Sequence, residues 1–129
     1  CMASAKLWVS KVRLHLFNQD YIVFFDMLSE TKKKKKLRGQ VPHLWNCQSI
    51  EVDGTVYITG GSLANTKTYL KQTYAIDEVN WELKQLADMN YQRDAHGVIE
   101  WRKAGGEIFI LAIGSWHVDR NTKTCEIYD

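Results

Sequence analysis

Cysteine is scarce in this chain of 129 residues, and the three cysteines present form no pattern. Cys1, Cys47 and Cys125 lie far apart, and no two of them make a C-x-x-C pair. A disulfide framework needs an even set of cysteines, and a zinc site needs closely spaced ligand pairs. The sequence therefore predicts free thiols, with no disulfide core and no zinc site.

Long hydrophobic runs are also missing. The longest, residues 21–25 and 108–113, are far shorter than the roughly 20 residues of a membrane-spanning helix. Residues 1–6 are not followed by the apolar region of a secretory signal, and no Asn-x-Ser/Thr acceptor occurs. We therefore expect a cytoplasmic protein with no membrane partner.

A large excess of charge of one sign is missing as well. Seventeen basic residues against fifteen acidic residues leave a net charge of +2. Nucleic-acid-binding proteins carry a broad positive surface. Nucleic acid is therefore not an expected partner.

Motifs for catalysis or metal binding are not found. The double glycine at 60–61 lacks the Lys-Ser/Thr sequel of a phosphate-binding loop, and no G-x-S-x-G occurs. Cys47 is four residues from His43, out of its reach in an extended segment. No metal-ligand spacing such as H-E-x-x-H joins any of the four histidines, which are His15, His43, His96 and His117. We predict no catalytic residue, no metal, no cofactor and hence no enzyme.

The sequence does contain strand patterns. Val12, Leu14 and Leu16 alternate with polar residues, as in a strand with one wet face. Residues 21–25 are continuously apolar, which is typical of a strand covered on both faces. The chain is therefore expected to begin with β-structure.

Two similar hairpins follow. Residues 47–52 and 55–59 flank Asp53-Gly54, a pair that accepts the positive φ of a tight turn. Residues 96–101 and 107–113 flank a longer turn. Two hairpins of one kind indicate an internal repeat.

Other markers recur at one distance. Three strand-like segments end on an aspartate, at Asp26, Asp77 and Asp129, and these aspartates are 51 and 52 residues apart. Tyr57 and Phe109 are likewise 52 residues apart. Residues 79–89 also fit helical spacing, but the repeat requires a strand there. We favour the strand because the period constrains the whole chain.

One repeat holds an ordered set of residues. An apolar strand leads into a double glycine, and a Tyr-Asp strand, a spaced Trp and then Met, Arg and His-Gly follow. These residues are Gly60, Gly61, Tyr74, Asp77, Trp81, Met89, Arg93, His96 and Gly97. Their order closely resembles the kelch pattern, in which each repeat of about 50 residues forms a blade of four short strands.

The resemblance implies an all-β, kelch-type β-propeller fragment whose ring is not closed, with blades of four-stranded antiparallel sheet. Residues 1–43 would be a partial blade with a lysine-rich connection, 44–92 a complete repeat and 93–129 a truncated repeat. Since propellers have about four to eight blades, the remaining blades are expected in a longer chain. The earlier repeat departs from the pattern, with Glu30 at the Trp81 position.

Most motif residues would be structural. Gly60 and Gly61 would allow close backbone approach where a side chain would clash. Tyr74 and Trp81 would fill the seam between sheets. Arg93 would tie a blade together rather than touch a ligand, and His96 would be a packed histidine with its hydrogen bonds satisfied.

The resemblance further implies ligand binding on loops at one end of the sheets, here residues 62–67, 90–95 and 115–122. Trp and Arg dominate binding hot spots, which draws attention to the segment after Ser115. The alternative is a loop with no partner. The candidate partner-binding residues are Ser62, Asn65, Lys67, Gln92, Asp94, Trp116, His117, Asp119 and Arg120.

We therefore predict a protein–protein interaction scaffold, either a substrate adaptor of a ubiquitin ligase or a cytoskeletal module. The alternative is a segment of a propeller enzyme similar to copper-radical oxidases or sialic-acid isomerases, with its site at the ring axis. A domain before Cys1 would favour the adaptor, and convergent Tyr, His and Arg side chains at the axis would favour the enzyme.

The strongest local charge is the run Lys32–Lys36. Such blocks act as nuclear address signals or polyanion patches, or they are simply solvated. We favour a solvated segment, because the repeat places an outer strand and a connection between blades there.

Overall fold

The computed structural model describes residues 13–18, 20–40, 42, 44–63, 66–116 and 123–129. Every helix or strand assigned within these ranges is a β-strand, which confirms the predicted all-β class. No helix in this part of the chain is long and apolar enough to cross a membrane.

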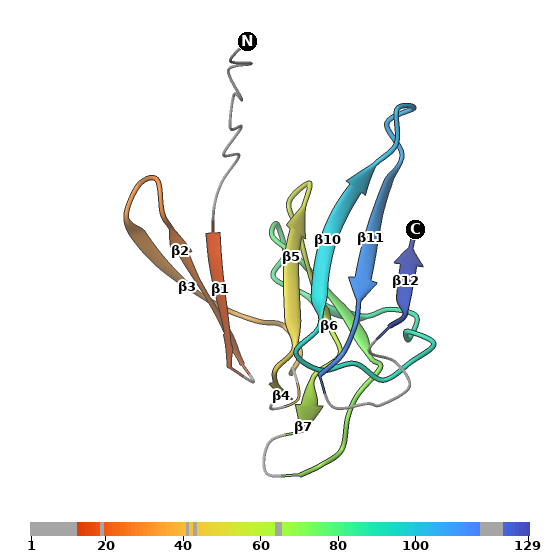
Figure 1. The fold of residues 1–129 in the computed structure, drawn as a ribbon. Helices are drawn as coiled ribbons and strands as arrows, with labels where there is room; N and C mark the ends of the chain where they lie inside the picture. Colours follow the sequence, from red (N-terminus) through yellow and green to blue (C-terminus); the bar gives the residue numbers. More distant parts are fainter. Residues whose placement is uncertain (1–12, 19, 41, 43, 64–65, 117–122) are drawn as a thin grey trace.

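Three antiparallel sheets, each formed by one continuous stretch of chain, contain most of the strands (Figure 1). The first has the order β1 (Arg13–Asn18), β2 (Tyr21–Asp26), β3 (Thr31–Lys36). The middle sheet has the order β5 (Gln48–Val52), β6 (Thr55–Thr59), β8 (Thr73–Asp77), β9 (Leu83–Gln85). The third has the order β10 (Gly97–Arg102), β11 (Ile108–Ile113), β12 (Cys125–Tyr128), and a separate short pair joins β4 (Leu44–Trp45) to β7 (Ser62–Leu63).

The middle sheet is the four-stranded antiparallel sheet that the repeat predicts. Its first hairpin turns at Asp53 (φ 47°) and Gly54 (φ 79°), the left-handed pair that a two-residue turn requires. Residues 79–89 contain strand β9 and no helix, so the helical alternative is wrong. Residues 44 and 45, expected at the start of this sheet, instead pair with β7.

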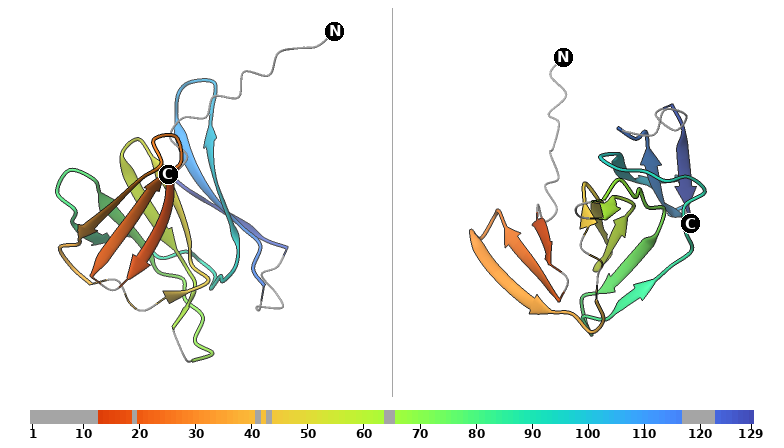
Figure 2. Two further views of the ribbon diagram at one scale, coloured as in Figure 1. Left: turned by 90° about the vertical axis from the view of Figure 1, so that its left-hand side faces the viewer. Right: turned by 90° about the horizontal axis from the view of Figure 1, so that it is seen from below.

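The main core lies between the first and middle sheets, which stand side by side (Figure 2). Trp81 packs against this core, and its ring meets that of Phe24 edge-on, with centroids 5.2 Å apart. Since Phe24 belongs to β2, Trp81 lies in the seam between two sheets, as expected. The buried residues of the core are Ile22, Phe24, Leu37, Val56, Ile58, Tyr74 and Ile76.

Strand β2 corrects one expectation. Only Ile22 and Phe24 are buried, and they share the face that packs on the middle sheet. Tyr21 and Val23 are half-buried and Phe25 is exposed, so this strand is not covered on both faces. A continuous apolar run does not distinguish two covered faces from one.

The turns after β2 and β8 repeat one design. The Asp26 and Asp77 carboxylates each accept a hydrogen bond from the backbone N–H two residues further on, at 2.9 and 2.8 Å. Glu30 (φ 52°) and Trp81 (φ 57°) then occupy equivalent left-handed positions, 51 residues apart. The internal period is therefore present in the backbone as well as in the sequence.

Candidate partner-binding surface

Several connections converge at the end of the sheets opposite the β2–β3, β5–β6 and β10–β11 turns (Figure 1). Strand β4 pairs with β7 there, and the segment from 90 to 96 is bonded to both neighbouring connections. Gly61 N donates to Arg93 O at 2.7 Å, and Ala95 N donates to Asn46 O at 2.9 Å. We call this region, residues 44–47, 60–63, 66–70, 90–96 and 114–116, the loop end.

The double glycine makes this convergence possible. Gly60 and Gly61 both have positive φ, 56° and 97°. A Cβ on Gly60 would lie 2.3 Å from Arg93 O, and one on Gly61 would lie 2.7 Å from Trp45 O. Only glycine fits at either position, as the sequence predicts.

Arg93 joins the loop end to the third sheet and is fully buried. Its Nη2 lies 3.0 Å from Glu126 Oε1, and its Nε donates to the same oxygen at 3.1 Å. Its Nη1 donates to the carbonyls of Gly114 (2.7 Å) and Thr124 (3.1 Å). Arg93 therefore ties the loops of the middle sheet to the third sheet, whereas the sequence predicted that it would tie one blade together.

Asp94 lies at the centre of the loop end. Its backbone carbonyl accepts a hydrogen bond from Trp116 N at 3.0 Å, and its backbone N–H donates to Ser115 Oγ at 3.2 Å. Asn46 Nδ2 donates to Asp94 Oδ2 at 3.4 Å. One buried residue thus holds both the segment after Trp45 and the segment that carries Trp116.

His96 is buried between the loop end and the sheets, with 4% of its surface exposed. Its Nε2 lies 2.7 Å from Thr59 Oγ1, but its Nδ1 is buried without a hydrogen-bond partner in the described structure. The prediction that His96 is packed in the core is therefore confirmed, but the prediction that both its ring nitrogens are hydrogen-bonded is wrong for Nδ1. Burial, and secondarily the charge of Arg93, lowers the pKa of His96 to about 4, so the ring is neutral near pH 7.

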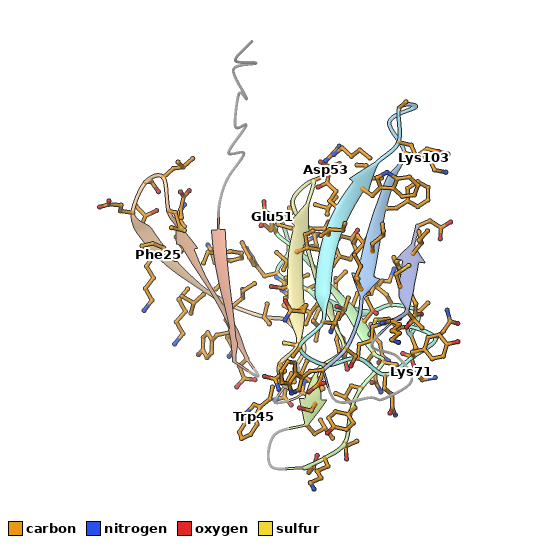
Figure 3. All side chains as sticks on the ribbon, viewed as in Figure 1. Phe25, Trp45, Glu51, Asp53, Lys71 and Lys103 are labelled. Carbon is orange, nitrogen blue, oxygen red and sulfur yellow. The ribbon has the colours of Figure 1, made fainter. Side chains whose placement is uncertain are left out.

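Two tryptophans project from this scaffold into solvent. Trp45 is 51% exposed and Trp116 is 74% exposed, and both neighbour the hydrogen bonds of Asp94. Figure 3 shows Trp45 at the loop end and Lys103 at the opposite end of the molecule. Sequence reasoning missed Trp45, which ends the two-residue strand β4.

The structure places the sequence-predicted binding residues unequally. Lys67, Gln92 and Trp116 are exposed at the loop end. Ser62 and Asp94 are buried, at 6% and 1% exposure, so they support the loops instead of presenting a surface. Asn65, His117, Asp119 and Arg120 lie outside the described residues.

The remaining motif residues have structural environments. Tyr74 and Met89 are buried, and Asp77 orders its turn by accepting hydrogen bonds from Val79 and Asn80. Gly97 is exposed, and a Cβ there would meet nothing closer than 3.8 Å. Glycine is therefore not sterically required at this motif position.

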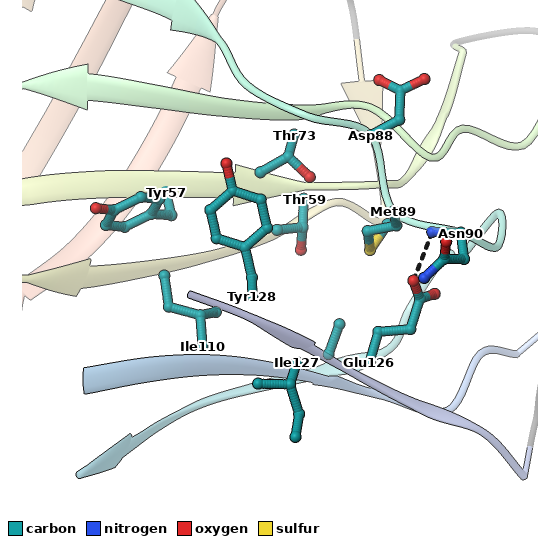
Figure 4. A pocket seen from close by; sticks show the side chains of 11 residues that line it. Tyr57, Thr59, Thr73, Asp88, Met89, Asn90, Ile110, Glu126, Ile127 and Tyr128 are labelled. Carbon is teal, nitrogen blue, oxygen red and sulfur yellow. Dashed lines mark hydrogen bonds between the residues drawn. The ribbon is translucent and has the colours of Figure 1, made fainter. Parts of the chain in front are cut away.

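A pocket of about 70 Å³ lies between the middle and third sheets (Figure 4). Tyr57 and Thr73 line one side, and Ile110 and Tyr128 line the other. Ligand sites usually enclose at least about 300 Å³, whereas a gap of this size suits a few water molecules. The pocket is therefore a packing gap between the two sheets and not a ligand site.

Chemically reactive groups are few in the described structure. No three His, Cys, Asp or Glu side chains of this part of the chain gather as metal ligands would. Burial raises the pKa of the Cys47 thiol, which keeps it protonated and a weak nucleophile. His43, the neighbour considered for Cys47, lies outside the described residues.

No protein-family profile and no curated protein matches the chain.

Proposed function

We propose that this chain belongs to a kelch-type propeller scaffold and that the loop end binds a protein partner. The observation that carries the proposal is the pair of exposed tryptophans, Trp45 and Trp116, on segments that hydrogen bonds to the buried residue Asp94 hold in place. Tryptophan is enriched at binding hot spots, and a fixed anchor loses little conformational entropy when it binds.

The arrangement of the sheets supports the propeller part of the proposal. Three sheets stand side by side, and β5 contacts β10, the first strand of the next sheet. The turns after β2 and β8 repeat with a period of 51 residues. Successive blades of a propeller have this relationship, in which each sheet covers the face of its neighbour.

Affinity capture with matched baits tests the binding site. The unmodified chain, Trp45→Ala, Trp116→Ala and Trp101→Ala would each be immobilised and exposed to the same cell extract, and bound proteins would be quantified. Trp101 is a suitable control because it is 42% exposed but lies in the β10–β11 hairpin, near Lys103 at the far end.

We expect a specific partner to be retained by the unmodified chain and by Trp101→Ala and to be lost from both loop-end variants. Equal capture by all four baits, or no specific capture by the unmodified chain, would refute the proposal. The identity of the captured protein would show whether the scaffold serves a ubiquitin ligase or the cytoskeleton. In the first case, the captured protein would be ubiquitylated in cells less efficiently when Trp116 is replaced.

A further inference from the structure

Strand β3 combines an open sheet edge with a row of cations. It pairs with β2 on one side, and no other described strand pairs with it. Five of its six residues are lysines, Lys32–Lys36, and all six are exposed. Within the described chain none of these lysines forms an ion pair with a carboxylate. The strand therefore offers both unpaired backbone groups and uncompensated charge.

The lysines divide between the two faces of the sheet. Lys33 and Lys35 lie opposite Phe24 and Ile22, on the face that packs on the middle sheet. Lys32, Lys34 and Lys36 share the other face with Phe25, Val23 and Tyr21. A ligand aligned with the strand would therefore meet positive charge on both faces.

Aromatic rings position two of these ammonium groups. Lys34 Nζ lies 4.0 Å from the centre of the Tyr21 ring, and Lys35 Nζ lies 5.5 Å from the Trp81 ring. A groove of about 390 Å³ runs beside the inner face of the strand, lined by Lys33, Lys35 and Trp81 and, on its other sides, by Phe24, Thr31 and the acidic residues Asp26 and Glu78. Acidic side chains of a ligand are therefore expected beside the lysines and not at the far wall of this groove. Side chains of an added strand would have space on this inner face.

We propose that β3 is a docking strand for an extended acidic segment of another protein. Such a segment would pair its backbone with the open edge, as in strand addition, and place carboxylates opposite the lysines. Neighbouring residues on one face of a strand repeat every 6.6–6.8 Å or so in both partners, so the charges stay in register. This site is distinct from the loop end.

Other occupants fit less well. A second copy of β3 would place lysines opposite lysines, which is repulsive. A nucleic acid would use the charges but leave the backbone edge unpaired, and a net charge of +2 gives little wider positive surface. An acidic peptide uses both features at once.

Fluorescence anisotropy with defined peptides tests the proposal. The probe is a fluorescein-labelled peptide with five consecutive glutamates between Gly-Ser flanks. One control peptide has glutamines in their place, and a second keeps the glutamates but carries an N-methyl group on the backbone amide of every glutamate. This removes the hydrogen-bond donors from both edges of the extended peptide without removing charge. A single-stranded oligouridylate of equal charge serves as competitor.

Two variants with the same net charge distinguish binding at β3 from non-specific binding to lysines elsewhere on the surface. One replaces Lys33–Lys36 with glutamine, and the other replaces Lys71, Lys84, Lys103 and Lys123, which are also exposed. We expect the first to bind the glutamate peptide at least about tenfold more weakly and the second less than about twofold more weakly. Neither the glutamine nor the N-methylated peptide should bind comparably, and Trp116→Ala should bind normally.

Amide hydrogen exchange on the unmodified chain gives a second readout that does not depend on a variant's folding. Amides of β3 that do not bond to β2 should exchange more slowly when the glutamate peptide is added, and amides of β10 should not. Equal binding of the N-methylated peptide, preferential binding of oligouridylate, or no binding of the glutamate peptide would each overturn the proposal.

Discussion

Arg93 and Glu126 form an ion pair between the loop end and β12, with both side chains removed from water. The arginine side chain is fully buried and the glutamate side chain is 10% exposed. The Glu126 carboxylate also accepts the backbone N–H groups of Asn90 and Tyr91. This pair fastens the middle part of the chain to the third sheet.

Replacing Arg93 should therefore be strongly destabilising. Arg93→Ala leaves a buried carboxylate without its partner and should lower the free energy of unfolding by about 3–5 kcal/mol. Arg93→Lys keeps the charge but cannot reproduce the forked contacts, so we expect most of that loss to remain. Urea denaturation measures both. Arg102→Lys, which alters an exposed ion pair with Asp53, is the control and should leave the transition unchanged.

Lowering the pH should destabilise the chain, because His96 has a depressed pKa in the folded state. The pKa of His96 is about 4 in the folded chain and about 6.5 when unfolded, so between these values the unfolded state binds more protons. Stability from this residue is present above pH 6.5 and is lost as the pH falls toward 4, by on the order of 3 kcal/mol at full shift. Comparing urea transitions of the unmodified chain and His96→Gln at pH 7 and 4.5 should show a steeper loss in the former. Parallel losses would contradict the assignment.

Gly60 should tolerate no side chain. Its substitution by alanine places a Cβ 2.3 Å from Arg93 O, so the backbone must move apart at the loop end. We expect Gly60→Ala to cost about 3 kcal/mol or more in thermal or urea unfolding. Gly105→Ala is the control, because nothing lies within 4 Å of its Cβ position. Similar melting of the two variants would show that the contact is not rigid.

These positions illustrate what the sequence could predict. The hairpin at Asp53-Gly54, the turn at Asp77 and the seam position of Trp81 follow from local turn chemistry and from the period. The burial of Asp94 could not be foreseen, since it depends on Asn46 and Ser115, 48 and 21 residues away.

The same limit explains the error over β2. Its apolar run predicts a strand, but whether a second layer covers Phe25 depends on which sheet, if any, lies beside that face. Trp45 was missed for a related reason, because the sequence does not show which side chain of so short a strand as β4 faces solvent.

Replacing Trp81 and replacing Trp116 should have different effects on the free energy of unfolding. Trp81→Ala removes a ring packed on Phe24 and should cost about 3 kcal/mol in the free energy of unfolding. Trp116→Ala should change it by no more than about 0.5 kcal/mol, because the ring is 74% exposed. Chemical denaturation followed by circular dichroism checks both. The assignment fails if Trp81→Ala unfolds like the unmodified chain.

Neutralising the lysine strand should cost little stability but promote self-association. Replacing Lys33–Lys36 with serine and glutamine removes exposed side chains whose only ring contacts in the described part of the chain are those of Lys34 with Tyr21 and of Lys35 with Trp81. Each such contact contributes about 0.5–1 kcal/mol at an exposed site, so unfolding should shift by no more than about 2 kcal/mol. Edge lysines also oppose pairing between copies, and their loss should raise the apparent mass in sedimentation experiments at high concentration. A larger loss of stability in dilute solution would reveal a structural role for the lysines.

The unequal exposure of the tryptophans gives the molecule a built-in optical signal. Of the four described tryptophans, Trp45, Trp101 and Trp116 are exposed, and Trp81 alone sits in the seam. Trp81 is half-buried and packs on Phe24, so its environment changes when the first and middle sheets come apart. In a variant with phenylalanine at the other four tryptophan positions, the emission of Trp81 would therefore report whether these sheets remain together, without an added label.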